Sequence, residues 1–98
     1  RASVPFEPGI TKVALRKRDG DECAYCGQPM VFRRAKNREF RDDDATIEHR
    51  LPLSRGGKHV WSNVVLACRE CNLSKNQKTE SEFLEYRKAI EDAQRERN

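Results

Sequence analysis

The chain has 98 residues, of which 36% are hydrophobic and 37% are charged, with a formal net charge of +4. A chain this short and polar excludes a large hydrophobic core, so a covalent or metal cross-link is expected to support the fold. Its longest apolar run, residues 64–68, is too short for a membrane span or a signal peptide. The excess of Lys and Arg (20 against 16 Asp and Glu) fits a nucleic-acid partner and equally an ordinary solvated surface.

The N-terminal residues 1–20 are expected to form an arm followed by one short helix. Prolines and a glycine in residues 1–9 favour irregular chain. Thr11 is predicted to cap a helix that runs through Leu15 and Arg18 and ends at Gly20. Because Arg1 stands where a Met would begin a chain, we expect a piece of a longer protein.

Four cysteines occur as two Cys-x-x-Cys pairs, Cys23 with Cys26 and Cys68 with Cys71. The two-residue spacer lets both sulfurs of a pair reach one ion, so two pairs predict a tetrahedral Zn²⁺ site of structural type. Gly27 suits the left-handed turn of a zinc knuckle. Two disulfides in a secreted scaffold are the alternative, and we favour zinc because nothing in the sequence indicates secretion.

Residues 31–44 carry a basic stretch that runs into three aspartates, 42–44. Segments 31–32 and 39–40 are predicted to be the arms of a hairpin. The basic residues fit a phosphate-contacting loop or a solvated hairpin, and both interpretations stay open. The aspartates favour a turn over a cation site.

The rest of the chain is expected to contain a short strand followed by two helices. Residues 45–47 are predicted to be a short strand entering Glu48-His49, and residues 68–76 a helix carrying the second cysteine pair. Residues 80–97 are strongly helical in composition, with Ser81 or Thr79 as N-cap. Phe83, Ile90 and Ala93 belong to a stripe predicted to pack against the core.

The motifs resemble the HNH endonuclease signature over residues 23–75. The elements occur in order: Glu48-His49, Pro52-Leu53, Gly56-Gly57, an Asn before an apolar segment (Asn63), and Cys68-x-x-Cys71-Asn72 followed by Lys75. Five ordered elements make the resemblance specific, whereas a lone Glu-His pair would mean almost nothing. The resemblance implies an α+β fold: a small ββα-metal (HNH, His-Me finger) domain held by a four-cysteine structural zinc, with flanking N- and C-terminal helices.

The same resemblance implies roles for single residues. His49 would be the general base that activates water, and Asn63 would pin the loop between the strands and orient His49. Glu48 and Asn72 would hold one catalytic divalent cation, and Asn76, one helical turn later, is a further candidate ligand. Phosphate contacts are expected from Arg50, Arg55, Lys58 and Lys75. His59 has no partner in the motif, and we expect a loop residue, with phosphate contact as the alternative.

Two positions depart from the commoner family pattern and define an H-N-N variant. Asn72 stands where His is usual, and Glu48 where Asp or His is usual. Because both would offer oxygen, Mg²⁺ or Mn²⁺ is favoured at the catalytic site, beside Zn²⁺ at the cysteines.

The sequence therefore predicts one nuclease domain over 1–98, with core 23–76, N-terminal arm and helix 1–20 and C-terminal helix 79–97. It would hydrolyse double-stranded DNA, leaving 5′-phosphate and 3′-hydroxyl ends, in the cytoplasm of a bacterium or as a phage product, with no membrane contact. A zinc-stabilised module that binds nucleic acid without cleaving it is the first alternative. An interaction domain that uses the C-terminal helix is the second.

Overall fold

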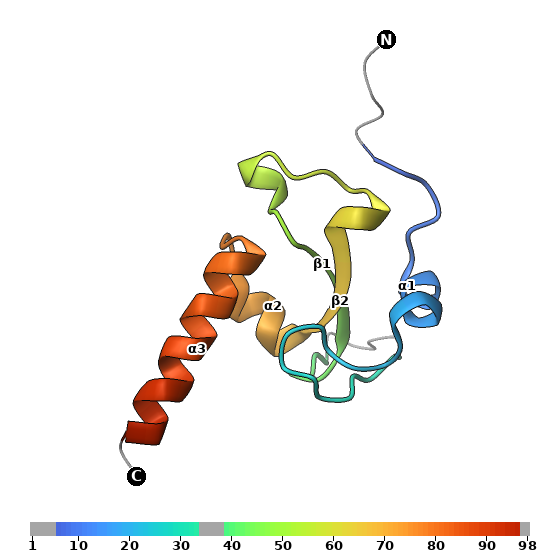
Figure 1. The fold of residues 1–98 in the computed structure, drawn as a ribbon. Helices are drawn as coiled ribbons and strands as arrows, with labels where there is room; N and C mark the ends of the chain where they lie inside the picture. The colour runs from blue at the N-terminus through green and yellow to red at the C-terminus, as the bar shows by residue number, and fades with distance from the viewer. Residues whose placement is uncertain (1–5, 34–38, 97–98) are drawn as a thin grey trace.

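A two-stranded antiparallel sheet lies at the centre of the computed structural model, which describes residues 6–33 and 39–96 (Figure 1). Strand β1 (Ala45–His49) pairs with β2 (Val64–Cys68), so that Ala45 lies opposite Cys68 and His49 opposite Val64. Every residue of β2 is buried. Since side chains alternate along a strand, Glu48 and His49 point to opposite faces of the sheet.

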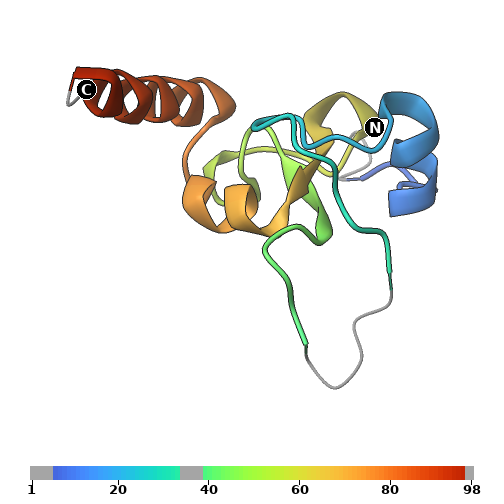
Figure 2. The same ribbon diagram turned by 90° about the horizontal axis from the view of Figure 1, so that it is seen from below.

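Helix α2 (Arg69–Lys75) continues directly from β2 and packs back on the sheet, which completes a ββα unit (Figure 2). Its first turn is held by the preceding aspartate segment, because the N–H groups of Arg69 and Glu70 donate to the carbonyls of Asp44 and Asp42. Within that segment the Asp44 carboxylate accepts from the Arg41 N–H at 2.9 Å. Residues 42–44 therefore serve as a turn that caps α2.

Helix α1 (Lys12–Asp19) confirms the predicted N-terminal helix. The Thr11 hydroxyl accepts from the Ala14 N–H at 3.1 Å, and the chain leaves the helix at Gly20. Leu15 has no exposed surface and belongs to the core beside β2. This helix thus covers the sheet with a single deeply buried side chain.

The first cysteine pair lies in a tight turn between α1 and β1. The Gly27 N–H donates to the Cys23 carbonyl at 3.0 Å, and Gly27 has a φ of 74°, the left-handed conformation expected of it. The Ala24 N–H donates to the Leu66 carbonyl. This turn is therefore attached to β2, close to the second cysteine pair.

The connection from β1 to β2 contains two short 3-10 helices, η1 (Leu53–Arg55) and η2 (Trp61–Asn63). It folds back so closely at Gly57 that a Cβ there would lie 1.8 Å from the Leu51 carbonyl oxygen. Only glycine fits at such an approach. The second glycine of the Gly-Gly motif is thus required by the shape of the loop.

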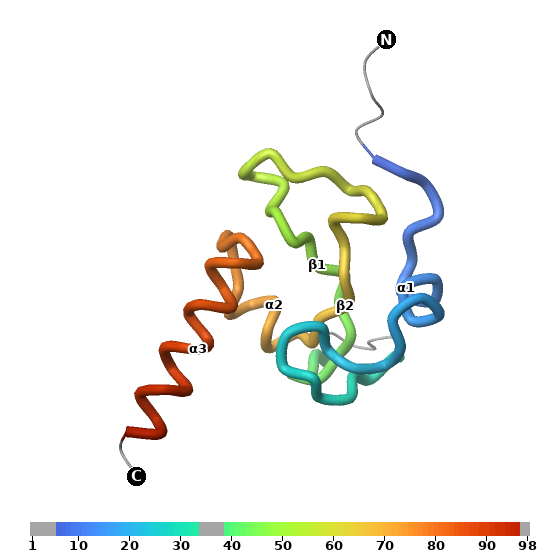
Figure 3. Tube along the Cα trace, viewed as in Figure 1, coloured from blue at the N-terminus to red at the C-terminus, as the bar shows by residue number. Residues whose placement is uncertain are grey.

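Helix α3 (Glu80–Glu96) projects away from the sheet (Figures 1 and 3). Its N-cap is Thr79, one of the two predicted candidates, which exchanges hydrogen bonds with Glu82 in a capping box. Phe83 is fully buried and meets Tyr25 edge to face, with ring centroids 5.3 Å apart. The predicted packing stripe is wrong beyond this point, because Ile90 and Ala93 are exposed on the projecting part.

The predicted hairpin in residues 31–40 is absent from the part of the chain that the structure describes, and its tip, residues 34–38, lies outside that part. Val31 instead pairs with Asp44 in an isolated parallel bridge. The predicted fold class is confirmed: a small α+β unit of the ββα type with a four-cysteine cluster. Among the described helices, none combines the length and apolar character needed to cross a bilayer.

Candidate active site and metal centre

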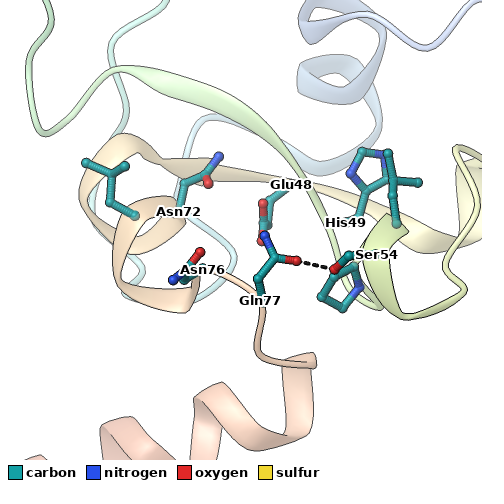
Figure 4. Close-up of a pocket in the computed structure, with 9 residues that line it drawn as sticks. Glu48, His49, Ser54, Asn72, Asn76 and Gln77 are labelled. Atoms are coloured by element: carbon teal, nitrogen blue, oxygen red, sulfur yellow. Dashed lines mark hydrogen bonds between the residues drawn. The ribbon is translucent and has the colours of Figure 1, made fainter.

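A cavity of about 420 Å³ opens between the β1–β2 connection and α2. In the view of Figure 4, Glu48 lies between Asn72 on one side and His49 on the other, with Asn76 and Gln77 below. The fold thus brings together Glu48, His49, Asn72 and Asn76, four of the residues predicted from the sequence to be catalytic or metal-binding. The residues that line the cavity are Glu48, His49, Pro52, Leu53, Ser54, Asn72, Leu73, Asn76 and Gln77.

Glu48 is 9% exposed and forms an ion pair with Lys75 at 2.9 Å. Lys75 has no exposed surface, and its ammonium also donates to the His49 carbonyl at 2.7 Å. One buried cation therefore fixes both the Glu48 carboxylate and the backbone of His49. Sequence reasoning missed this pair, although Lys75 lies four residues after the zinc-knuckle residue Cys71 and so on the same helix face.

Asn72 is held at the opposite wall by a chain of hydrogen bonds. Its Nδ2 donates to the Thr46 hydroxyl at 3.0 Å, and that hydroxyl donates to the Ala67 carbonyl at 2.7 Å. Because the nitrogen is engaged with the sheet, the amide oxygen is the atom available to another partner. Asn76, with a φ of 50°, ends α2 at the cavity wall.

The donor set fits a hard divalent cation. It consists of one carboxylate from Glu48 and amide oxygens from Asn72 and Asn76 around one cavity. Oxygen ligands of this kind are those that Mg²⁺ and Mn²⁺ prefer, whereas zinc prefers nitrogen and sulfur. The residues present are thus suited to the metal that the sequence implied.

His49 is half-buried at the end of β1, on the opposite face of the strand from Glu48. Burial, followed by the nearby His59, lowers the pKa of His49 from its usual range. A lowered pKa keeps the imidazole neutral at pH 7, which is the form able to accept a proton.

His59 is the residue whose surroundings the sequence did not foresee. Its Nδ1 lies 2.9 Å from Nε2 of His49, so the only two histidines of the chain are hydrogen-bonded. Two features of the sequence could have indicated this contact: the chain has only two histidines, and both lie close to the Gly-Gly loop.

Asn63 ties the two ends of the loop together. Its Oδ1 accepts from the Leu51 N–H at 2.9 Å, and its Nδ2 donates to the carbonyls of Leu51 and Lys58 at 3.0 and 2.9 Å. The Asn63 carbonyl also accepts from the Arg50 N–H at 2.8 Å. These bonds fix the chain immediately after His49.

Replacing Asn63 by Ala is expected to free the Leu51 amide, because that N–H loses its acceptor. Hydrogen exchange followed by NMR should show faster exchange of the Leu51 amide, with a loss of stability of about 1–3 kcal/mol for the three bonds. Asn63→Asp keeps the oxygen that accepts from the Leu51 N–H but sets a second oxygen against the carbonyls of Leu51 and Lys58, so its Leu51 amide should exchange more slowly than in Asn63→Ala and faster than in the parent. Equal exchange in all three proteins would contradict this role of the side chain.

The four residues expected to touch phosphate have different environments. Arg50 and Arg55 form ion pairs with Glu80 and Glu82 at the start of α3, and each arginine side chain remains 44–45% exposed. Lys58 is exposed. The expectation fails for Lys75, because its ammonium is fully buried against Glu48 and is not accessible to a phosphate.

The four cysteines converge on one point, two from the turn after α1 and two from the junction of β2 with α2. Their sulfurs all lie within 4.8 Å of one another, and those of Cys26 and Cys68 are 3.9 Å apart. Tetrahedral coordination at about 2.3 Å places sulfurs roughly 3.8 Å apart. The predicted convergence is confirmed, and the geometry is that of a zinc-type site.

The surroundings of the sulfurs also suit a cation. Burial raises the pKa of Cys23, but N–H donors from Cys26, Cys68 and Tyr25 outweigh it and bring the pKa to about 7. Burial raises the pKa of Cys68 to about 11 and also raises that of Cys71. Four thiols this close, three of them buried, cannot all ionise alone, whereas a bound Zn²⁺ balances their charge.

The comparison with protein families agrees with this geometry. A family model described as HNH endonuclease matches residues 23–78, more than half of the chain and the whole of the ββα unit. The chain therefore belongs to the HNH endonuclease family, a family of nucleases that bind metal and act on nucleic acid. No individual curated protein is significantly similar to the chain.

Proposed function

We propose that this protein is a divalent-metal-dependent endonuclease that hydrolyses phosphodiester bonds of double-stranded DNA, leaving 5′-phosphate and 3′-hydroxyl ends. The observation that carries the proposal is the single cavity lined by Glu48, His49, Asn72 and Asn76. A module that only binds nucleic acid has no need of a buried carboxylate, a neutral imidazole and amide oxygens around one cavity.

His49 is proposed as the general base. A neutral imidazole at the cavity wall can take a proton from water as the water attacks phosphorus. Its main chain is fixed from two directions, by Lys75 at its carbonyl and by the Asn63 bonds just after it. Asn63 is thus proposed as a positioning residue for the base.

Glu48 and Asn72 are proposed to hold the catalytic Mg²⁺ or Mn²⁺, with Asn76 as a further ligand. When bound, such an ion stabilises charge on the scissile phosphate and on the departing 3′ oxygen. The protein holds both proposed ligands in place: Lys75 fixes the Glu48 carboxylate, and Thr46 fixes the Asn72 amide. Zn²⁺ at the cysteines is proposed to be structural.

Three basic residues, Arg50, Arg55 and Lys58, lie in the β1–β2 connection beside the cavity and are proposed to contact the DNA backbone. Both arginines already neutralise glutamates of α3. Backbone contacts of this kind give affinity that falls steeply with salt and carries little base information. Binding is therefore expected to be weakly sequence-specific.

Replacing His49 by Ala is expected to lower the rate of DNA cleavage about 10²–10⁴-fold, as for loss of a general base. The measurement is nicking of supercoiled plasmid by zinc-loaded protein with Mg²⁺ or Mn²⁺. Nicks that DNA ligase reseals without further treatment would establish 5′-phosphate and 3′-hydroxyl ends.

Lys88→Ala, at an exposed position of α3, is the matched control and should cleave like the parent protein. Equal nicking by parent and His49→Ala proteins would show a contaminating nuclease and defeat the proposal. Binding of duplex without cleavage under any divalent cation would favour the non-catalytic module.

A further inference from the structure

The two histidines of the chain meet across the β1–β2 connection. Nε2 of His49 and Nδ1 of His59 are 2.9 Å apart, and the two rings are tilted by 57° with centroids 5.2 Å apart. The residues are ten positions apart in sequence, one at the end of β1 and one just before η2. The contact therefore joins the end of β1 to the second half of the β1–β2 connection.

His59 is held in place by elements outside the loop. The Glu7 N–H donates to its carbonyl at 2.8 Å, and Phe6 pairs with it in an isolated parallel bridge. The Glu7 carboxylate accepts in turn from the Trp61 N–H at 2.7 Å. The N-terminal arm thus supports the main chain of His59.

The bond between the rings limits which nitrogen of His49 can act as a base. A neutral imidazole has one N–H donor and one acceptor nitrogen. If His49 donates through Nε2, its Nδ1 carries a lone pair and can accept a proton. If His49 accepts through Nε2, its Nδ1 carries the hydrogen and the ring cannot accept another proton there.

We propose that His59 is a positioning residue for the base: its Nδ1 accepts the Nε2–H of His49 and thereby holds the Nδ1 lone pair of His49 ready for water. This inference rests on the proposed role of His49 as general base. A base oriented by a third group is the usual arrangement in activated sites. The proton taken from water goes to Nδ1 of His49, and the Nε2–H stays between the rings throughout.

Once that proton is on His49, the bond between the rings becomes charge-assisted. The Nε2–H of an imidazolium is a stronger donor than that of a neutral ring. His59 therefore stabilises the state that forms during the reaction more than the resting state. Its loss should lower kcat more than it changes KM.

The test combines NMR with substitution of His59. In zinc-loaded parent protein without Mg²⁺, ¹⁵N shifts should show His49 protonated at Nε2 and unprotonated at Nδ1. In His59→Ala the two tautomers should mix, and kcat should fall about 10–100-fold, the usual effect of losing a supporting partner. Zinc content and melting temperature should stay close to those of the parent.

Two further variants form a matched pair. Asn places a carbonyl oxygen near the position of Nδ1, and Gln places it one bond farther out. His59→Asn is therefore expected to recover kcat to within about threefold and to restore the Nε2–H tautomer of His49. His59→Gln should behave like His59→Ala.

Some results would overturn the inference. They are an Nδ1–H tautomer of His49 in the parent protein, unchanged kcat in His59→Ala, and equal activity of the Asn and Gln variants. A parent protein with the Nε2–H tautomer fixed but with no cleavage of any DNA would defeat the proposed function, while the pairing of the two histidines would stand.

Discussion

Removing the metal from the four-cysteine site is expected to unfold the described part of the chain. Cys23, Cys68 and Cys71 are buried within the hydrophobic core, so the site and the core are one structure. Structural zinc contributes about 10–16 kcal/mol in small zinc domains. That is comparable to the total stability of about 5–15 kcal/mol that an ordinary domain has.

Circular dichroism at 222 nm during chelation would measure this loss, with metal content determined in parallel. We expect one zinc per chain, loss of helical signal when it is removed, and recovery with Zn²⁺ but not with Mg²⁺. Cys68→Ser should reproduce the loss, because it removes one of the four sulfurs, which lies 3.9 Å from the sulfur of Cys26. A chelated protein that keeps its melting transition would contradict this expectation.

Replacing Lys75 by Met is expected to cost about 3–5 kcal/mol of folding free energy, because it leaves the Glu48 carboxylate buried without a counter-charge. The His49 carbonyl loses its donor in the same step. Urea unfolding of zinc-loaded protein would measure the change. Cleavage should fall as well, since the substitution loosens both members of the Glu-His pair.

The double variant Lys75→Met with Glu48→Gln separates the contribution of the ion pair to stability from the contribution of side-chain packing. Removing both charges should return much of the stability, since neutral groups of similar size tolerate burial. Lys88→Met, at an exposed position, should change stability by no more than about 0.5 kcal/mol. If Lys75→Met behaved like Lys88→Met, the buried pair would contribute nothing to the fold.

Local signals in the sequence were sufficient for much of the fold. Thr11 and Gly20 mark the ends of α1 by their capping chemistry, and both positions are as expected. Gly27 marks the knuckle turn because only a residue tolerant of positive φ follows such a cysteine pair easily. Where a single residue type has one dominant physical use, its position alone is informative.

The parts that sequence did not reveal depend on contacts between distant residues. Lys75 is buried because Glu48, 27 residues earlier, provides its counter-charge. Helical periodicity cannot distinguish such a lysine from a solvated one. His59 lies against His49 in a loop that the Asn63 bonds also hold together. The exposed half of α3 shows the opposite case: its sequence has an apolar stripe that predicts packing, but no neighbour among the described residues covers that stripe.

Glu48 and His49 point to opposite faces of β1, so the site depends on the position of each residue in the strand register. Adding one residue within β1, ahead of Glu48, would shift the pair by one position and exchange the carboxylate and the imidazole between the two faces of the sheet. The glutamate would then take the present place of His49 opposite Val64, next to His59, and a residue from ahead of the pair would take the present place of Glu48 beside Asn72. The pairing of Ala45 with Cys68, at the far end of the sheet, fixes the register of β1 and therefore the face to which each of its side chains points. Variation in chain length is therefore not tolerable within the five paired positions of β1.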